Sequence, residues 1–166
     1  MKWFYTAETH RCWQRRSRVL RGLTAGLGLG ALAGCIVMCT QVNTATARTM
    51  LMAVITLSTL GGWGVLLTLA YGYYPARAEE AHIAGMLEET ETETVEGVLT
   101  ISPMQVKIPG SIAFARGSIR PDGAEEAMPV HVAARLLRQM PPAGSRVRVT
   151  VARRFITALE VLHEEA

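Results

Sequence analysis

Cysteine is scarce in this chain, with three residues among 166. Cys12 lies in a basic segment, whereas Cys35 and Cys39 stand one helical turn apart in an apolar stretch. No further metal ligands accompany that pair, and the spacings do not form a disulfide framework. We therefore expect the cysteines to be small apolar fillers, and we expect neither a metal nor a cofactor.

Catalytic motifs are also missing. The candidate groups are three histidines and two serines, namely His82, His131, His163, Ser111 and Ser118. No nucleophile elbow, metal-spaced histidine pair or glycine-rich phosphate loop surrounds them, and the Gly-Leu-Gly-Leu-Gly run at 26–30 has no strand before it. The alternating Thr and Glu residues at 89–94 give no rigid geometry for calcium or magnesium. The sequence predicts a protein that is not an enzyme.

Charge is absent between Arg21 and Arg48, and hydrophobic residues make up 49% of the chain. Two apolar runs account for this high share, one at 22–41 and the other at 49–74. Each contains a stretch of about 20 residues, which as a helix is about 30 Å long and matches the core of a bilayer. The sequence predicts two transmembrane helices joined by a short external loop at 42–48.

Basic residues before the first run set the expected orientation. Residues 1–21 contain six basic side chains against Glu8, whereas the loop has Arg48 alone. By the positive-inside rule the N-terminus is cytoplasmic, and two spans of the cell membrane return the C-terminus to the same side. Aromatic residues are interleaved with the basic ones: Trp3, Phe4, Tyr5 and Trp13. Such a segment either only sets the topology or lies in an anionic headgroup layer.

A second interpretation of the N-terminus is a cleaved signal. Leu32-Ala33-Gly34-Cys35 resembles the cleavage motif of bacterial lipoproteins, and Arg15-Arg16 resembles a twin-arginine signal. Either would place the C-terminal domain outside or behind a lipid anchor. A processed lipoprotein continues with a polar tether, whereas residues 36–38 continue the apolar run. We expect the first span to be retained, with cleavage before Cys35 as the minor alternative.

Small residues recur at four-residue spacing in both apolar runs. The first run contains a glycine ladder, defined as Gly22, Gly26, Gly30 and Gly34. The second run offers possible partners for it, namely Ser58, Gly62, Gly64, Thr68 and Gly72. Glycines on nearly one helix face let another backbone come close, so the ladder predicts a right-handed helix contact, within the hairpin or between protomers. The alternative is that glycine is simply common in membrane helices.

The composition changes after the second run. Pro75 is expected to end the helix, and residues 75–94 are expected to form an acidic linker that contains a short helix. From 95 to 166 the pattern is that of strands. The expected strands cover 95–101, 105–108, 111–119, 130–132, 146–151 and 155–162, with a turn at Pro109-Gly110 and a short helix before Pro141.

About five strands and one small helix in a compact domain suit a small barrel or rolled sheet. The strand number and the helix before the final pair of strands resemble an OB-type barrel. A membrane hairpin that carries such a barrel is similar in layout to NfeD-like proteins. The expected fold class is a membrane α-helical hairpin plus a small, mainly-β, OB-like C-terminal domain; layout alone implies no function.

Four arginines near the end of the chain form a candidate anion-contact face: Arg146, Arg148, Arg153 and Arg154. Few surface aromatics accompany them, so the sequence does not favour nucleic acid as a partner. The leading hypothesis is a non-enzymatic, two-span membrane protein that presents its β domain to the cytoplasm for protein interaction or scaffolding, with homo-oligomer formation through the helices as an option. An accessory subunit of a membrane transporter or protease complex is the alternative. A membrane-tethered binder of nucleic acid or anionic headgroups is a weaker one.

Overall fold

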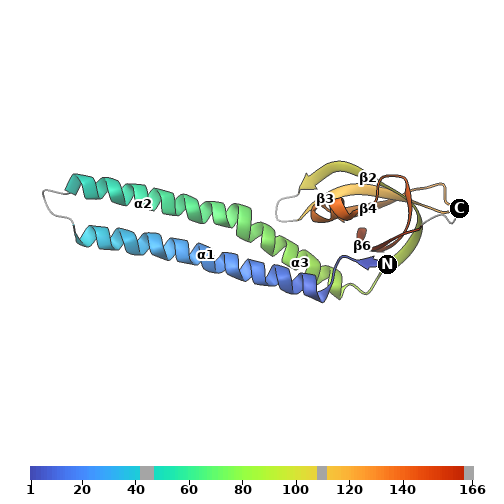
Figure 1. The fold of residues 1–166 in the computed structure, drawn as a ribbon, viewed down its shortest axis with the longest axis horizontal. Helices are drawn as coiled ribbons and strands as arrows, with labels where there is room; N and C mark the ends of the chain where they lie inside the picture. The colour runs from blue at the N-terminus through green and yellow to red at the C-terminus, as the bar shows by residue number, and fades with distance from the viewer. Residues whose placement is uncertain (42–46, 108–111, 163–166) are drawn as a thin grey trace. The chain divides into compact units, whose positions relative to one another are not determined.

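The computed structural model describes residues 1–41, 47–107 and 112–162. The chain divides into two compact units (Figure 1). Residues Trp13–Arg77 form one unit, which we call the hairpin unit. Met1–Cys12 and Ala78–Ala166 together form the other, which we call the barrel unit. Both ends of the chain therefore contribute to one folded body.

Two long helices supply the hairpin unit, α1 (Ala7–Thr40) and α2 (Ala47–Leu67). Both are long and apolar enough to cross a membrane, in agreement with the two predicted runs. Their outward side chains are large and exposed, among them Leu29 and Leu60, which are 67% and 66% exposed. A continuous apolar surface of this kind is costly in water and suits a lipid solvent. Of the predicted loop, residues 42–46 lie outside the described residues.

Pro75 does not end the helix, contrary to the expectation from the sequence. α2 continues through a six-residue π-helix, η1 (Thr68–Tyr73), into α3 (Tyr74–Glu88). The backbone N–H of Tyr74 donates to the carbonyl of Leu69, one residue further back than in an α-helix. A proline inside an α-helix clashes with the carbonyl four residues before it. Because the turn before Pro75 is wider, that clash is relieved and the helix continues to Glu88.

Five strands form a closed barrel in the barrel unit: β2 (Glu93–Lys107), β3 (Ala113–Pro121), β4 (Met128–Ala133), β5 (Ser145–Ala152) and β6 (Phe155–Val161). Their order is β6-β4-β3-β2-β5, and β5 pairs back onto β6. All pairs are antiparallel except β4 and β6, which meet in parallel through His131 and Phe155. A short 3₁₀ helix, η2 (Ala134–Gln139), lies between β4 and β5. This arrangement is the expected OB-like barrel.

β2 is one long strand where the sequence predicted two. It pairs with β5 over residues 93–99 and with β3 over 97–107. The register shifts between Ile101 and Gln105, and such an irregularity lets a strand bend from one partner to the next. The predicted strand at 105–108 is the far end of β2, while residue 108 and the predicted turn at Pro109-Gly110 lie outside the described residues.

Alternation along the strands separates the core from the surface. The valines of β5 are buried, and Val147 and Val149 are fully buried. Arg146, which comes directly before Val147, faces outward, as the pattern predicted. Gly97 lies where two strands come close together, because a Cβ there would lie 2.7 Å from the carbonyl carbon of Arg120. Only glycine fits at that point.

The N-terminal segment belongs to the barrel unit, which the sequence did not indicate. A two-residue strand, β1 (Lys2–Trp3), pairs antiparallel with β6 at Leu159 and Ala158. The next backbone N–H, from Phe4, donates to the carbonyl of Thr157 at 2.9 Å. Phe4 and Tyr5 are 4% and 6% exposed. Burial of each ring contributes about 1.5–3 kcal/mol, so the segment is a stable part of the fold.

Candidate functional site

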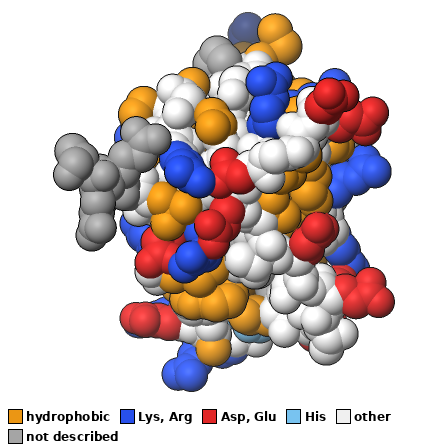
Figure 2. Space-filling model, turned by 90° about the vertical axis from the view of Figure 1, so that its right-hand side faces the viewer, with side chains coloured by type: hydrophobic (Ala, Val, Ile, Leu, Met, Phe, Trp, Pro, Cys, Tyr) orange, Lys and Arg blue, Asp and Glu red, His pale blue; other side chains and the backbone are white. Residues whose placement is uncertain are grey.

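Three of the four arginines in the predicted anion-contact face are paired with carboxylates. Arg146 donates to Asp122 at 2.5 Å, and Arg148 donates to Glu96 at 2.6 Å and to Glu160 at 3.3 Å. Arg153 forms an ion pair with Glu89. Figure 2 shows the result on one face of the barrel, where Lys and Arg side chains are interspersed with Asp and Glu. These exposed pairs add little stability, but they leave little positive charge for a ligand.

Three other arginines on the barrel surface carry positive charge that no ion pair in the described part of the chain neutralises. Arg116 and Arg120 on β3, and Arg154 in the turn between β5 and β6, are exposed, and no carboxylate among the described residues forms an ion pair with them. We call these three residues the arginine row. Of the four predicted arginines only Arg154 belongs to it. The turn that carries Arg154 has positive φ angles at Arg153 (47°) and Arg154 (69°), which a two-residue hairpin requires.

His131 lies between two members of the arginine row. It is opposite Arg116 in the β3–β4 ladder, and its backbone N–H donates to the carbonyl of Arg154 at 2.6 Å. Partial burial, followed by the charges of Arg116 and Arg154, lowers the pKa of its imidazole. The ring stacks on Phe114 with centroids 4.8 Å apart and an interplanar angle of 11°. His131 is therefore a neutral, packed surface histidine at neutral pH.

Two adjoining hollows lie over the outer face of β2 and β3. One has a volume of about 210 Å³ and is lined by Val98, Thr100, Ser118, Arg120 and Ala127. The other, of about 300 Å³, is lined by Thr100, Ile101, Ser102, Arg116, Gly117 and Ser118. They share the hydroxyl pair of Thr100 and Ser118, which are opposite each other in the ladder. Each hollow contains one member of the arginine row.

A buried polar cluster ties the N-terminal segment to α3 and η2. The Tyr5 hydroxyl lies 3.1 Å from His82 Nε2, and Arg135 stacks over the Tyr5 ring at 5.3 Å. Arg135 Nε donates to Glu79 Oε2 at 3.0 Å. His82 also packs edge-on against Phe155, with centroids 4.6 Å apart. We call Tyr5, Glu79, His82 and Arg135 the N-terminal clasp.

Burial fixes the protonation states in the N-terminal clasp. Desolvation, helped by the charge of Arg135, lowers the pKa of His82 to about 4. Desolvation also raises the pKa of Tyr5 to about 12, against the opposing effect of Arg135, and it raises the pKa of Glu79. The Tyr5 hydroxyl and a neutral imidazole therefore share one hydrogen bond at physiological pH. This arrangement anchors the segment and leaves no group poised as a general base.

The catalytic candidates of the sequence do not come together. His82 is held in the N-terminal clasp, His131 stacks on Phe114, and Ser118 lies on the outer face of β3. His163 and Ser111 lie outside the described residues. Within the described ranges, no cluster of three or more His, Cys, Asp or Glu side chains is arranged to hold a metal ion. The sequence missed Tyr5, Glu79 and Arg135, because no local motif links positions so far apart in the chain.

The predicted helix-packing residues divide into two groups in the hairpin unit. A Cβ at Gly34 would lie 2.8 Å from Leu57, and one at Gly72 would lie 3.2 Å from Leu20, so these two glycines face the other helix. Gly64 faces Leu27 at 4.0 Å, and the Thr68 hydroxyl donates to the Gly64 carbonyl at 2.7 Å. The members with nothing within 4 Å of an added Cβ are Gly22, Gly26, Gly30 and Gly62.

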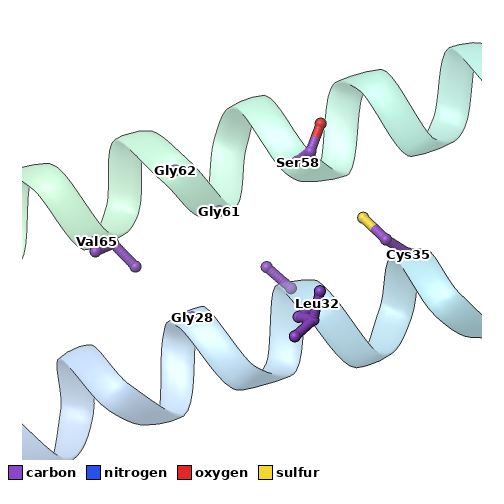
Figure 3. A pocket seen from close by; sticks show the side chains of 8 residues that line it. Gly28, Leu32, Cys35, Ser58, Gly61, Gly62 and Val65 are labelled. Atoms are coloured by element: carbon purple, nitrogen blue, oxygen red, sulfur yellow. The ribbon is translucent and has the colours of Figure 1, made fainter.

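A groove of about 310 Å³ opens between α1 and α2, and Ser58 and Gly62 are among the residues that line it (Figure 3). Two further glycines that face the other helix lie outside the predicted set. A Cβ at Gly61 would lie 2.5 Å from the Ala31 Cβ, and one at Gly28 would lie 3.7 Å from Val65. Cys35 Sγ lies 4.0 Å from the Val54 carbonyl at one end of the groove.

Comparison with known proteins gives little further information. No protein-family model matches the chain, and no curated protein matches it. One solved structure, the dimeric N-terminal domain of PriB protein from Thermoanaerobacter tencongensis, is similar to 46% of this chain over 100% of its own length. The identity is 19% and the TM-score is 0.36. The assignment of the OB-like barrel rests on the strand order alone.

Proposed function

We propose that this protein is a non-enzymatic, two-span membrane protein that holds an OB-like barrel at the cytoplasmic face of the cell membrane as a module for protein interaction or scaffolding. The pairing of β1 with β6 is the observation that carries the proposal. It joins the residues before α1 and those after α3 in one folded body. Both must then lie on the same side of any membrane that α1 and α2 cross, and the basic N-terminal segment favours the cytoplasmic side.

The same pairing argues against a cleaved lipoprotein. Cleavage before Cys35 would remove β1 together with the buried rings of Phe4 and Tyr5. The barrel would lose about 1.5–3 kcal/mol for each ring. Retention of the first span agrees with the fold, and the intact mass of the membrane-extracted protein checks it. A lipid-modified species that begins at Cys35 would refute this part of the proposal.

Cysteine accessibility tests the topology. The three native cysteines are replaced by serine, and one cysteine is introduced at Arg48, at the start of α2, or at Glu125, on an exposed loop of the barrel. We expect a membrane-impermeant maleimide to label position 48 in intact cells and position 125 only after lysis. Labelling of position 125 in intact cells would reverse the orientation. Equal labelling of both positions in intact cells would show that the helices do not cross.

Co-purification after mild detergent extraction tests the interaction role. A stoichiometric transporter or protease partner would favour the alternative, an accessory subunit of a membrane complex. The matched control is a chain with Tyr5→Ala, in which the barrel loses its N-terminal clasp while the helices are unchanged. Partners that remain bound to this variant contact the helices, and partners that are lost contact the barrel. Recovery of no partner by either chain would refute the scaffolding role.

The exposed members of the glycine ladder support self-association as part of the proposal. Gly22, Gly26 and Gly30 have nothing within 4 Å of an added Cβ, so a second copy can approach α1 there. Gly26→Leu should lower chemical cross-linking between copies and leave the hairpin unit folded. Unchanged cross-linking would show that the ladder is not an interface.

A further inference from the structure

The outer face of β2 and β3 carries a pair of hydroxyl groups without protein partners. Thr100 and Ser118 are opposite each other in the ladder and point to the same side, so their side chains are about 5 Å apart. Among the described residues, neither hydroxyl makes a hydrogen bond. The two groups form the shared floor of the two hollows. Hydroxyls placed in this way can donate two hydrogen bonds to one acceptor group.

Two unpaired cations flank this floor. Arg116 and Arg120 lie two residues to either side of Ser118 on β3, so all three side chains leave the same face of the strand. The Cα atoms of the two arginines are about 13 Å apart along the strand, and their long side chains can turn toward the centre. The nearest carboxylates in the ladder are already occupied, since Asp122 pairs with Arg146 and Glu96 pairs with Arg148. The groove therefore has an excess of positive charge.

This combination of groups identifies the chemistry of a ligand. Two guanidinium groups match a doubly charged anion, and guanidinium geometry fits the oxygens of a phosphoryl group. A carboxylate is a monoanion and would leave one arginine unpaired. Among the described residues that line the two hollows none is aromatic, so the groove gives nucleobases no ring on which to stack. The chemistry favours a compact phosphate over a nucleic-acid strand.

We propose that Arg116, Arg120, Thr100 and Ser118 form a phosphoryl-binding groove, whose ligand is a phosphate monoester or diphosphate. The phosphoryl group sits over the hydroxyl pair, with one arginine on each side. A lipid headgroup and a soluble phosphate ester present the same chemistry to this groove. The site differs from the predicted anion-contact face, whose arginines at 146, 148 and 153 are already paired.

Calorimetric titration of the full-length protein in a non-ionic detergent tests the groove, with inorganic phosphate and pyrophosphate as the probes. We expect saturable binding by the native chain. Arg116→Gln or Arg120→Gln should weaken it about ten- to a hundredfold, which is the effect of losing a hydrogen bond to a charged group. Ser118→Ala should weaken it about two- to tenfold. The matched control is Arg138→Gln, because Arg138 is also exposed on the barrel unit but lies outside the groove, and it should bind like the native chain.

Three outcomes would overturn the proposal. The first is no saturable binding of either probe up to about 10 mM. The second is equal weakening by Arg138→Gln, which would show a general charge effect. The third is tight binding of a single-stranded oligonucleotide that neither phosphate nor pyrophosphate displaces, which would assign the face to nucleic acid. Circular dichroism of each variant confirms that loss of binding does not come from loss of the fold.

Reconstitution distinguishes the two sources of phosphate. The protein is placed in discs of phosphatidylcholine with or without a minor fraction of phosphatidic acid, whose headgroup is a phosphate monoester. If phosphatidic acid reduces the binding of added pyrophosphate, the natural ligand is a lipid headgroup. If pyrophosphate binds equally in both discs, it is a soluble phosphate ester. Either result supports the groove only if Arg116→Gln weakens pyrophosphate binding in the discs about ten- to a hundredfold. Unchanged binding by this variant would overturn the proposal.

Discussion

Removal of the Tyr5 side chain should release the N-terminal segment from the barrel. Tyr5 is 6% exposed, and its ring is covered by Arg135 while its hydroxyl reaches His82. Truncation of a buried aromatic residue to alanine costs about 3–5 kcal/mol. Small domains are stable by only about 5–15 kcal/mol, so Tyr5→Ala removes a large fraction of the stability.

Tyr5→Phe separates the hydrogen bond from the packing. This change keeps the ring and removes only the hydroxyl, which leaves Nε2 of His82 without its hydrogen-bond partner at 3.1 Å. A buried polar atom that is left without a partner costs about 1–3 kcal/mol. We therefore expect the phenylalanine variant to lose about half of the stability that the alanine variant loses.

Hydrogen–deuterium exchange of the full-length protein in detergent measures both effects. The reporting segments are residues 2–6 and the β6 strand, which share the hydrogen bond from Phe4 to Thr157. Exchange should accelerate in the order native, Tyr5→Phe, Tyr5→Ala. Trp3→Ala is the matched control, because Trp3 is on the same segment but 56% exposed, and it should change the local stability by less than about 0.5 kcal/mol. Equal acceleration in the Trp3 and Tyr5 alanine variants would refute the clasp.

Three further predictions concern pH and the glycines. His82 has a folded pKa of about 4 against an ordinary 6.5, so the unfolded state binds more protons between these values. The contribution of His82 to the free energy of unfolding of the barrel should be fully present above pH 6.5. It should fall by about 1–2 kcal/mol toward pH 4, a value reduced for solvent screening at this partly exposed site. In thermal melts, His82→Gln should lose this pH dependence. The raised pKa of Glu79 changes stability with pH in the opposite sense, so the native chain must be compared with His82→Gln. The same pH dependence in both would contradict the lowered pKa of His82. Gly97→Ala should lower the melting temperature of the barrel by several degrees, since its Cβ would strike the Arg120 carbonyl, and an unaffected melt would contradict the register. Gly61→Leu should weaken the packing of α1 against α2 in detergent, whereas Gly62→Leu should not, because there is open space at that position. A reversed order of the two variants would show that α1 and α2 pack through other faces.

The barrel could be predicted because its signals are local. Strict alternation in Arg146–Val151 marks a strand with one buried face, and the same rule located β3, β4 and β6 to within a few residues. The predicted helix after β4 is present as η2, in the tighter 3₁₀ form. The prediction divided β2 into strands at 95–101 and 105–108, whereas in the fold the strand continues across a register shift.

The missing parts depend on contacts between distant residues. A two-residue strand such as Lys2–Trp3 has no periodicity, and its pairing exists only once β6 offers an edge. Arg148 looked available for an anion because the sequence does not show that Glu96 and Glu160 lie on the neighbouring strands. Arg116 and Arg120 are separated in the sequence by ordinary strand residues, so only the ladder reveals that they flank a hydroxyl pair. Pro75 is tolerated because of a π-turn that no simple pattern announces.

The position of β1 also constrains how the chain is made. During synthesis the first residues leave the ribosome long before Ala158 and Leu159, their partners in β6. Phe4 and Tyr5 therefore stay uncovered until β6 has been synthesised, and the barrel can close only then. The N-terminal pairing therefore cannot form before β6 is present. A chain that stops before β6 would expose these rings to chaperones and proteases, which gives the cell a direct means to recognise an unfinished molecule.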